Sequence, residues 1–508
     1  MTTLRFNIIN SIKLTAMLCL LLTLSACSLH DFLRASDAQT TAPVALKVGE
    51  GFVDPIGYYE QKPRFSWQIA PSAKYQFQHA YQIQVASSVA LLANADLWDS
   101  AKQQSSTNTW VKYQGKPLAS RQKVFWRVRI WDEHAQVSPW SKPASLELGL
   151  LNNNDWQGQW IRHPETGETD NFDFHHKKKN TIIKVKNKVY RPQYLRTAFE
   201  TKTQTQNKTT IKQARLYITA KGIFNAYING LRVSDDVMTP GWTPYLQRIE
   251  TLTYDVTGLV SNGKNVLAAT VAEGWHTGRI LMPRPLKIKP SALLAQLEIE
   301  YNDGSKQVIA TDNNWQVTLN GPIRAAGNYD GENYDANYEM PGWHTADFAA
   351  TNWNKVITEP LEPQVALAPK RHQAAAVTLT IPAISIVEVA DPKPGVVVFD
   401  MGQNMLGVPE LSLPAIANQK ITVRFAEALQ NNKFYTTNLR SAKATDTYIP
   451  AKSGVIKYIP TFTFHGYRFV EISGFDQSQT PELRRVTGRV LHSHFNVHAH
   501  FKTSHAKL

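Results

Sequence analysis

The densest group of acidic residues lies in the sequence YDGENYDANYE, and its members are Asp330, Glu332, Asp335 and Glu339. Inverting hydrolysis of a glycosidic bond needs a carboxylic acid and a carboxylate roughly 6.5–9.5 Å apart. Residues two apart in a strand share one face, with side chains about 6–7 Å apart, so Asp330 and Glu332 have a suitable spacing. Gly331 and the turn residues around it leave that geometry open. Three interpretations remain: solvated loop acids, ligands of a sugar or of calcium, which prefers several oxygen ligands, and a catalytic pair.

Two tryptophans follow glycines, a setting typical of exposed turns: Trp242 in PGWTPY and Trp275 in EGWHTGRI. An indole ring stacks on the apolar face of a sugar, while a nearby Arg279 or an acid bonds the sugar hydroxyls. A carbohydrate-binding site would then combine these three residues with Asp330, Glu332 and Asp335. The alternative is that both tryptophans fill the core or a domain boundary. A third GW pair, at Trp343, weakens the argument for any one of them.

The C-terminal histidines form two H-x-H pairs, and their members are His492, His494, His498 and His500. Alternate residues of a strand share a face, so each pair has two imidazoles positioned for zinc. No flanking acid or cysteine completes a ligand set, which favours a chance cluster. The sequence also has no G-x-S-x-G elbow and no phosphate-binding glycine loop. We therefore expect no nucleotide cofactor and no required metal, and calcium remains the one candidate ion.

The bulk composition is that of a multidomain globular protein, with 508 residues of which 43% are hydrophobic and 19% charged. Much of the net charge of +14 lies in residues 175–188, which hold six lysines and no acids. Lysine runs usually stay in water, so we expect a solvated insertion loop; an anionic glycan or lipopolysaccharide is the alternative partner. No nucleic-acid-binding motif accompanies the charge, so we expect no nucleic-acid partner.

The N-terminus is typical of an exported lipoprotein. Basic residues precede a short apolar run that ends in LSAC at 24–27, too short for a spanning helix. The tetrad is similar to the bacterial lipobox, in which Cys27 is acylated and becomes the new N-terminus, so we expect a signal peptide at 1–27 and a tether at 28–43. Ser28, rather than an aspartate, favours the outer membrane, with the protein periplasmic or on the cell surface. Several acyl chains on one cysteine anchor a protein firmly to a membrane. Both cysteines of the chain lie in 1–27, so we expect no intrachain disulfide.

Period-two alternation runs through the rest of the chain, as in YQIQVASS and VFWRVRIWD, and no sustained helical pattern occurs. Asn229-Gly230 between alternating runs predicts a hairpin. The sequence therefore predicts an all-β chain of tandem β-sandwiches. The expected segments are a fibronectin III/Ig-like sandwich (44–150), a linker with the basic insertion (151–192), a jelly roll (193–360), a second β-sandwich (361–495) and a short terminal segment (496–508).

Several long phrases, in this order, resemble the bacterial α-L-rhamnosidase family of glycoside hydrolases. ARLYITAKGIFNAYINGLRVSDDVMTPGWTPY and EGWHTGRI are similar to its N-terminal jelly-roll module. FDMGQNMLG, RFAEALQNNKFYTTNLRSAKATDTYI and FTFHGYRFVEI are similar to the β-sandwich that precedes its catalytic domain. The resemblance covers roughly residues 43–508. It implies that the catalytic acid and base sit in an α/α barrel that these residues do not include, so that 496–508 is the truncated start of the catalytic domain and no catalytic residue lies in this chain.

The resemblance implies action on terminal α-L-rhamnose in oligo- or polysaccharides, with the chain inactive when isolated. Two hypotheses remain open: a hydrolase cut short, whose catalytic domain is lost or is a separate chain, and a stand-alone glycan-binding lipoprotein. In the first case, part of the last sandwich is expected to be an apolar face that meets water, and exposed strand edges invite association. We expect those edges near FTFHGYRFVEI and VHAHF.

Overall fold

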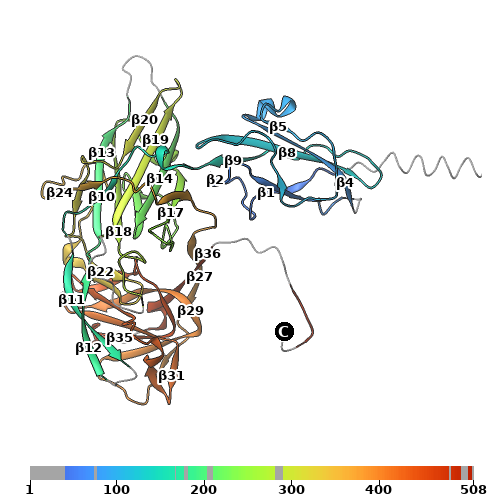
Figure 1. The fold of residues 1–508 in the computed structure, drawn as a ribbon. Coiled ribbons are helices and arrows are strands. Elements are labelled where there is room, and N and C mark those ends of the chain that lie inside the picture. The colour runs from blue at the N-terminus through green and yellow to red at the C-terminus, as the bar shows by residue number, and fades with distance from the viewer. Residues whose placement is uncertain are drawn as a thin grey trace, which may run out of the picture. The chain divides into compact units, whose positions relative to one another are not determined.

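The structure is a computed structural model that describes residues 41–73, 77–165, 167–176, 181–202, 210–280, 290–479, 482–493 and 501–505. In these ranges the chain consists of β-strands joined by loops and short 3-10 turns, of which the longest is η1, Val89–Asn94 (Figure 1). The predicted all-β class and the tandem sandwiches are confirmed. No helix among the described residues combines the length and the apolar character that a membrane span requires. Cys27, the predicted signal peptide and most of the predicted tether lie outside the described residues.

The described residues divide into two compact units, and the first comprises those from residue 41 to Pro55 together with the described part of Glu60–Glu147. It is a sandwich of two antiparallel sheets. One sheet has the order β1 (Val44–Val48), β3 (Arg64–Gln68), β7 (Val111–Lys112). The other contains β9 (Ala144–Leu148), β8 (Lys123–Asp132), β4 (Gln78–Ala86) and β5 (Trp98–Asp99), with β6 (Gln103–Gln104) paired to β4.

Strand β8 shows why this sequence folds as a sandwich. Its buried residues alternate with partly exposed ones along KVFWRVRIWD, and Trp126 and Val128 face the core. On the other face the guanidinium groups of Arg127 and Arg129 lie 4.4 Å and 4.6 Å from the ring centroid of Trp140. The alternation predicted from the sequence is therefore confirmed, and the outward arginines are held by cation–π contacts.

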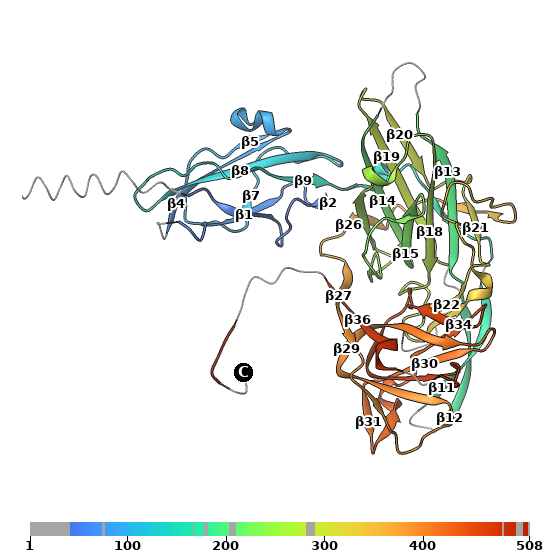
Figure 2. The same ribbon diagram turned by 180° about the vertical axis from the view of Figure 1, so that it is seen from behind.

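The second unit also includes β2 (Ile56–Tyr58) and begins its main body as a jelly roll of two facing sheets (Figures 1 and 2). The first sheet has the order β25 (Ile357–Glu359), β10 (Trp160–Arg162), β19 (Ala292–Tyr301), β14 (Ile211–Lys221), β17 (Arg248–Asp255), β26 (Ala366–Pro369), with β20 (Lys306–Ala310) on β19. The second has the order β16 (Leu231–Arg232), β15 (Ile223–Ile228), β18 (Lys264–Ala272), β13 (Gln193–Glu200), β21 (Gln316–Thr318), β24 (Asn354–Lys355).

The jelly-roll core lies between these sheets. Leu216 and Ile218 of β14 and Leu267 and Val271 of β18 are buried in one cluster. The Asn229-Gly230 hairpin between β15 and β16 is confirmed, since both residues have the positive φ angles that a tight two-residue turn requires.

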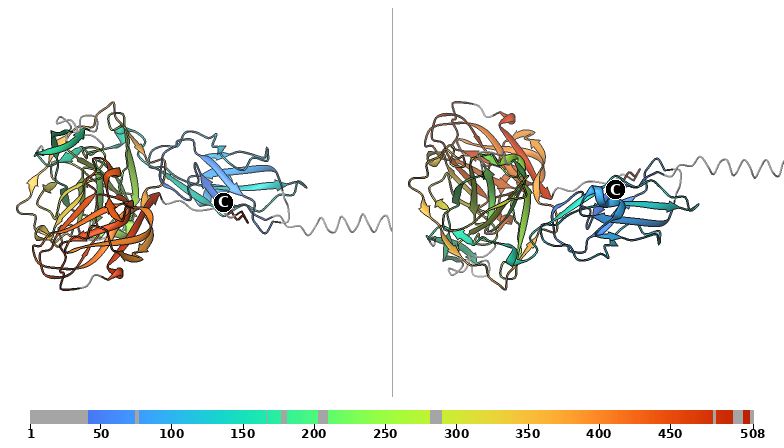
Figure 3. Two further views of the ribbon diagram at one scale, coloured as in Figure 1. Left: turned by 90° about the horizontal axis from the view of Figure 1, so that it is seen from below. Right: turned by 90° about the horizontal axis from the view of Figure 1, so that it is seen from above.

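The last body of the second unit is a large sheet that curls around its own core (Figure 3). Its order is β22 (Ile323–Gly327), β23 (Gly331–Asp335), β33 (Thr445–Ile449), β30 (Ile421–Ala426), β35 (His465–Ser473), β29 (Val396–Ala415), β36 (Val486–Ser493), β27 (Ala375–Pro382). Strands β28 (Ser385–Val387) and β34 (Gly454–Tyr458) pair with β29, and β31 (Ala428–Gln430) pairs with β32 (Lys433–Tyr435). Phe425, Tyr467 and Leu411 are buried in its core.

The predicted boundary at residue 360 needs correction, because the two bodies exchange strands. The β22–β23 hairpin precedes the boundary but pairs in parallel with β33 of the C-terminal sheet. Conversely, β26 follows the boundary but pairs in parallel with β17 of the jelly roll. Backbone pairing between segments this far apart in the chain has no local sequence signal.

Two further expectations were wrong. The basic insertion predicted as a loop contains two strands, β11 (Glu168–His176) and β12 (Thr181–Val189), paired as an antiparallel hairpin. The phrase FTFHGYRFVEI is not an exposed edge, because β35 lies inside the sheet between β30 and β29. The edges of this sheet are β22 and β27, and Leu379 of β27 is 55% exposed. Most of VHAHF lies outside the described residues.

Candidate functional site

The acidic cluster is organised by the β22–β23 hairpin. Gly331 starts β23 with a φ of +95°, and a Cβ there would lie 2.2 Å from the carbonyl oxygen of Thr445. Only glycine permits this close approach of two backbones. The approach sets the parallel pairing of β23 with β33, in which Asn333 is opposite Thr447.

Glu332 points into the protein and is completely buried. Its Oε2 accepts hydrogen bonds from the backbone N–H groups of Thr461 (3.0 Å) and Phe462 (2.9 Å), and its Oε1 accepts one from the Tyr458 hydroxyl (3.2 Å). Burial raises the pKa of the Glu332 carboxyl to about 7, and the nearby Asp446 carboxylate adds to that rise against the two N–H donors. A side chain with no exposed surface cannot touch a sugar, so the described geometry gives no support to Asp330 and Glu332 as a catalytic pair.

A second buried acid stabilises the same region. Oδ1 of Asp446 accepts a hydrogen bond from the backbone N–H of Glu332 (2.8 Å) and lies 3.0 Å from Nε2 of His465. The His465 ring stacks on Phe425 with centroids 3.9 Å apart. Glu332, Asp446 and His465 connect β23, β33 and β35. Sequence reasoning missed Asp446 and His465 because each lies in a separate strand with no motif of its own.

Arg279 and Asp330 are brought together by the fold. Nε of Arg279 donates to Oδ2 of Asp330 at 3.2 Å, and Nη2 bonds Oδ1 of the same carboxylate. Nη1 and Nη2 of Arg279 also donate to the hydroxyl (3.1 Å) and the carbonyl (2.7 Å) of Ser441. Arg279 is buried, so its guanidinium fastens the loop around Ser441 to the hairpin.

The remaining predicted sugar ligands lie in different environments. Trp242 is 66% exposed, whereas Trp275 is partly buried against a small core cluster and lies 6.1 Å from Phe464. Asp335 caps η4 (Ala336–Tyr338) by accepting from the backbone N–H of Asn337 at 3.0 Å. The six predicted residues therefore do not converge on one surface, and Trp242 is the most exposed aromatic among them.

The remaining candidates are the possible metal ligands and Trp343. Within the described ranges, no three His, Cys, Asp or Glu side chains come close enough to hold a metal ion, so calcium stays a prediction. His492 is exposed, and the other three histidines of the H-x-H pairs lie outside the described residues. Trp343 is buried and packs edge-on against Tyr194 at 5.2 Å, so it belongs to the core.

Sequence reasoning also missed a cavity of about 520 Å³ in the second unit. It is lined by Arg232 at the end of β16 and the segment after it, by strands β27, β29 and β36 and by the loop that precedes β35. Arg232, Asp235 and Thr461 contribute polar groups, and Val237 and Met238 contribute apolar ones. The only sequence signal was the exposed charged stretch LRVSDD after the Asn-Gly turn.

Three family models match the chain in order. The α-L-rhamnosidase N-terminal domain matches residues 209–378. The Rha78A-like N-terminal immunoglobulin domain matches 43–152, and the bacterial α-L-rhamnosidase concanavalin-like domain matches 390–492.

Curated relatives and solved structures agree with these matches. An α-L-rhamnosidase from Alteromonas sp. (strain LOR) is 45% identical over 95% of this chain and 50% of the relative, and one from Formosa agariphila is 46% identical over 91% and 48%. The structure of α-L-rhamnosidase from Dictyoglumus thermophilum has a TM-score of 0.79 at 32% identity, covering 89% of this chain and 49% of that one. The Streptomyces avermitilis α-L-rhamnosidase complexed with L-rhamnose has a TM-score of 0.77 at 29% identity, covering 89% and 57%. The chain spans about half the length of the curated relatives it matches. It therefore belongs to the bacterial α-L-rhamnosidase family and carries that family's N-terminal β-domains.

Proposed function

We propose that this chain is the N-terminal part of a secreted, lipid-anchored α-L-rhamnosidase-like glycoside hydrolase that acts on terminal α-L-rhamnose in glycans. The observation that carries the proposal is the ordered match of three rhamnosidase modules across residues 43–492. The relatives that share these modules are α-L-rhamnosidases, and one of them is complexed with L-rhamnose.

The same proposal holds that these residues alone do not hydrolyse rhamnosides. An acid–base pair must reach both sides of the scissile bond. In the acidic cluster, Glu332 is sealed from solvent and Asp330 is bound to Arg279. The β-domains would then position glycan and catalytic domain without supplying the reacting groups.

Activity of the purified chain tests this proposal. Residues 28–508 are expected to release no rhamnose from an aryl α-L-rhamnoside above a blank. Turnover that disappears in Glu332→Gln or Asp330→Asn would make the acidic cluster catalytic and overturn the proposal.

Membrane attachment through acylated Cys27, in an outer-membrane lipoprotein exposed to the periplasm or the cell surface, belongs to the same proposal. Its support is the LSAC tetrad after a short apolar run. Calcium binding is the further proposal for the cofactor, and it is tested by the change in melting temperature on adding calcium and then a chelator.

A second candidate function is a stand-alone glycan-binding lipoprotein. The observation that favours it is the 66% exposure of Trp242, because a large exposed indole is a common platform for a sugar ring. The reading frame that follows Leu508 separates the candidates. A frame encoding an α/α barrel supports the hydrolase, with the barrel in the same chain or as a separate partner, and unrelated sequence supports the binding protein.

A further inference from the structure

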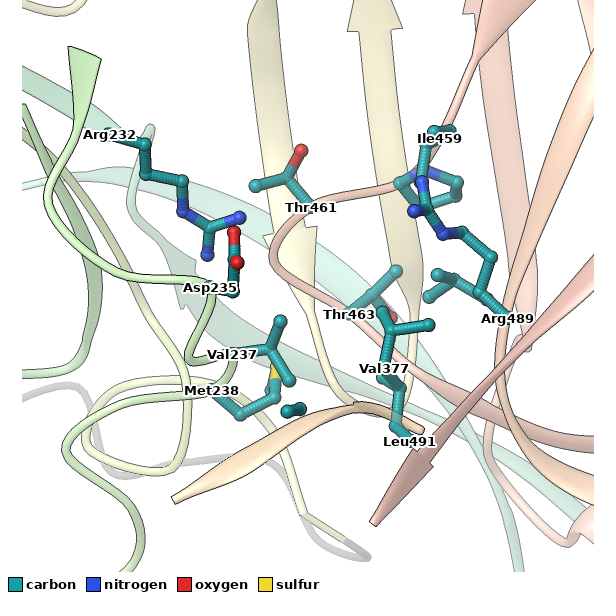
Figure 4. Close-up of a pocket in the computed structure, with 13 residues that line it drawn as sticks. Arg232, Asp235, Val237, Met238, Val377, Ile459, Thr461, Thr463, Arg489 and Leu491 are labelled. Atoms are coloured by element: carbon teal, nitrogen blue, oxygen red, sulfur yellow. The ribbon is translucent and has the colours of Figure 1, made fainter. Parts of the chain in front are cut away.

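The 520 Å³ cavity of the second unit has the size of a small-ligand site (Figure 4). One wall is the segment that follows β16, and the opposite wall is formed by β27, β36 and the loop before β35. The backbone N–H of Val237 donates to the carbonyl of Ala375 at 2.8 Å. This bond fixes the jelly-roll segment against strand β27, so the cavity is formed before any ligand arrives.

The rim of the cavity carries groups suited to sugar hydroxyls. Arg232 and Asp235 line one wall, and Thr461 lies on the loop before β35 (Figure 4). Nη2 of Arg232 donates to Oδ1 of Asn225 (2.9 Å) and to the carbonyl of Asp236 (2.6 Å), so its guanidinium is held in place. An oriented guanidinium donates to a hydroxyl oxygen while a carboxylate accepts from a neighbouring hydroxyl, which together recognise a vicinal diol.

Most of the remaining lining is apolar, and Arg489 of β36 and Thr463 add two further polar side chains to it. Val237 and Met238 face Val377 of β27 and Leu491 of β36 across the cavity (Figure 4). Val377 is 36% exposed although it is apolar. Water forms no hydrogen bond with such a wall. A methyl group placed against it is removed from water, and this burial of apolar surface favours binding. No aromatic ring contributes to the described lining, so stacking on a ring face is not the mode of recognition here.

We propose that this cavity binds one 6-deoxyhexose residue of a glycan. Such a sugar presents hydroxyls along one edge and a methyl group at the other, which matches the polar rim and the aliphatic wall. The identity of the sugar as L-rhamnose rests on the proposed function. The site is separate from the acidic cluster, because Glu332 is completely buried and does not line the cavity, and its bond to the lining residue Thr461 is to the backbone N–H.

The test is a titration of residues 28–508 with methyl α-L-rhamnoside. The protein is labelled with ¹³C at the methionine methyl groups, and their NMR signals are followed. The Met238 signal, assigned through Met238→Leu, is expected to shift with a dissociation constant of about 1–5 mM, as for a ligand of this size. The matched sugar is methyl α-L-mannoside, which differs only by a hydroxyl on C6. It is expected to bind about tenfold more weakly, because its hydroxyl would meet the aliphatic wall.

Three variants and one control locate the site. Asp235→Ala removes an exposed carboxylate with no hydrogen bond to preserve, and Thr461→Val keeps the backbone bond to Glu332. Val377→Glu places a charge in the aliphatic wall. Asp235→Ala is expected to weaken binding at least tenfold, since a lost charged hydrogen bond is worth about that factor. Thr461→Val and Val377→Glu are expected to weaken binding as well, because the first removes a hydroxyl partner and the second places a charge against the sugar methyl group. Asp347→Ala, another exposed jelly-roll aspartate outside the cavity, is expected to bind like the parent.

The outcomes separate this proposal from the proposed function. If rhamnoside binds but none of the three variants weakens it, or if Trp242→Ala abolishes it, the cavity is not the site while the family function stands. If the Met238 signal does not move at saturating rhamnoside, or moves equally with the mannoside, the deoxyhexose site is overturned. Rhamnose release by a complete enzyme tests the proposed function independently of all these results.

Discussion

Replacing Glu332 with glutamine is expected to make the protein more stable at alkaline pH, although the substitution removes a hydrogen-bonded carboxylate. Glutamine has the same shape. Its Oε1 can accept the two backbone N–H groups of Thr461 and Phe462, and its Nε2 can donate to the hydroxyl of Tyr458. The variant therefore imitates the protonated acid and removes the charge that burial disfavours.

The magnitude follows from the pKa. Burial raises the pKa of Glu332 from 4.5 to about 7, so the folded protein holds this proton more tightly than the unfolded chain. The contribution of this group to stability is fully present below pH 4.5 and is lost as the pH rises through about 7. At about 1.4 kcal/mol for each pKa unit, the loss amounts to about 3 kcal/mol of unfolding free energy. Asp446 and the hydroxyls of Tyr458 and Tyr194 are the titratable groups that face Glu332.

Calorimetry of residues 28–508 between pH 4.5 and 8 measures this effect. Glu332→Gln is expected to melt like the parent near pH 4.5 and about 6 °C or more above it at pH 8. Glu388→Gln, which changes an exposed glutamate of the same body, is the control and is expected to follow the parent throughout. Infrared difference spectra should show a protonated carboxyl band at pH 6 that Glu332→Gln lacks. If the variant is instead less stable than the parent at pH 8, the carboxylate is ionised and stabilised by its N–H donors, and the reasoning is wrong.

Three further predictions concern the backbone at Gly331, the ion pair between Arg279 and Asp330, and the lipid anchor at Cys27. Gly331→Ala is expected to lower the melting temperature sharply, because the new Cβ would lie 2.2 Å from the carbonyl oxygen of Thr445. A loss of about 1 kcal/mol in unfolding free energy lowers the melting temperature by several degrees. A melting temperature within about 1 °C of the parent would therefore refute that close approach. Arg279→Met is expected to lower the unfolding free energy measured in urea by about 2 kcal/mol, because the bonds to Asp330 and the Ser441 loop are lost. Adding Asp330→Asn to this variant should recover part of that loss. No recovery would mean that the two residues do not act as a pair. Cys27→Ser is expected to stay unacylated and uncleaved, as labelling with a fatty acid would detect; a variant that matures and partitions like the parent contradicts the lipobox.

Local patterns predicted the features that depend on neighbours in sequence. The period-two alternation of strand β8 and the Asn229-Gly230 turn were both visible, because a strand alternates its faces and a two-residue hairpin needs positive φ angles. Alternation says that a strand has two faces, but it does not say what covers each of them. For acidic residues in a turn-rich stretch, the sequence therefore predicts exposure to solvent or binding of a sugar.

The environment of Glu332 could not be predicted for this reason. Its donors at Thr461 and Phe462 and its neighbour Asp446 lie more than 100 residues further along the chain. Only the parallel pairing of β23 with β33 brings them together, and parallel pairing across long connections leaves no signature in a short window. The ion pair between Arg279 and Asp330 likewise leaves no local signal, although the sequence predicts both residues as ligands of the same sugar.

Rhamnose release by two matched proteins decides whether residues 28–508 need a further domain for catalysis. One is residues 28–508 alone, and the other is the same segment fused to the part of the Alteromonas relative that this chain does not cover. We expect no release of rhamnose from an aryl α-L-rhamnoside by the segment alone and clear release by the fusion. Release by the segment alone at a rate comparable to the fusion would contradict the assignment of these residues to the β-domains that accompany catalysis elsewhere in the enzyme.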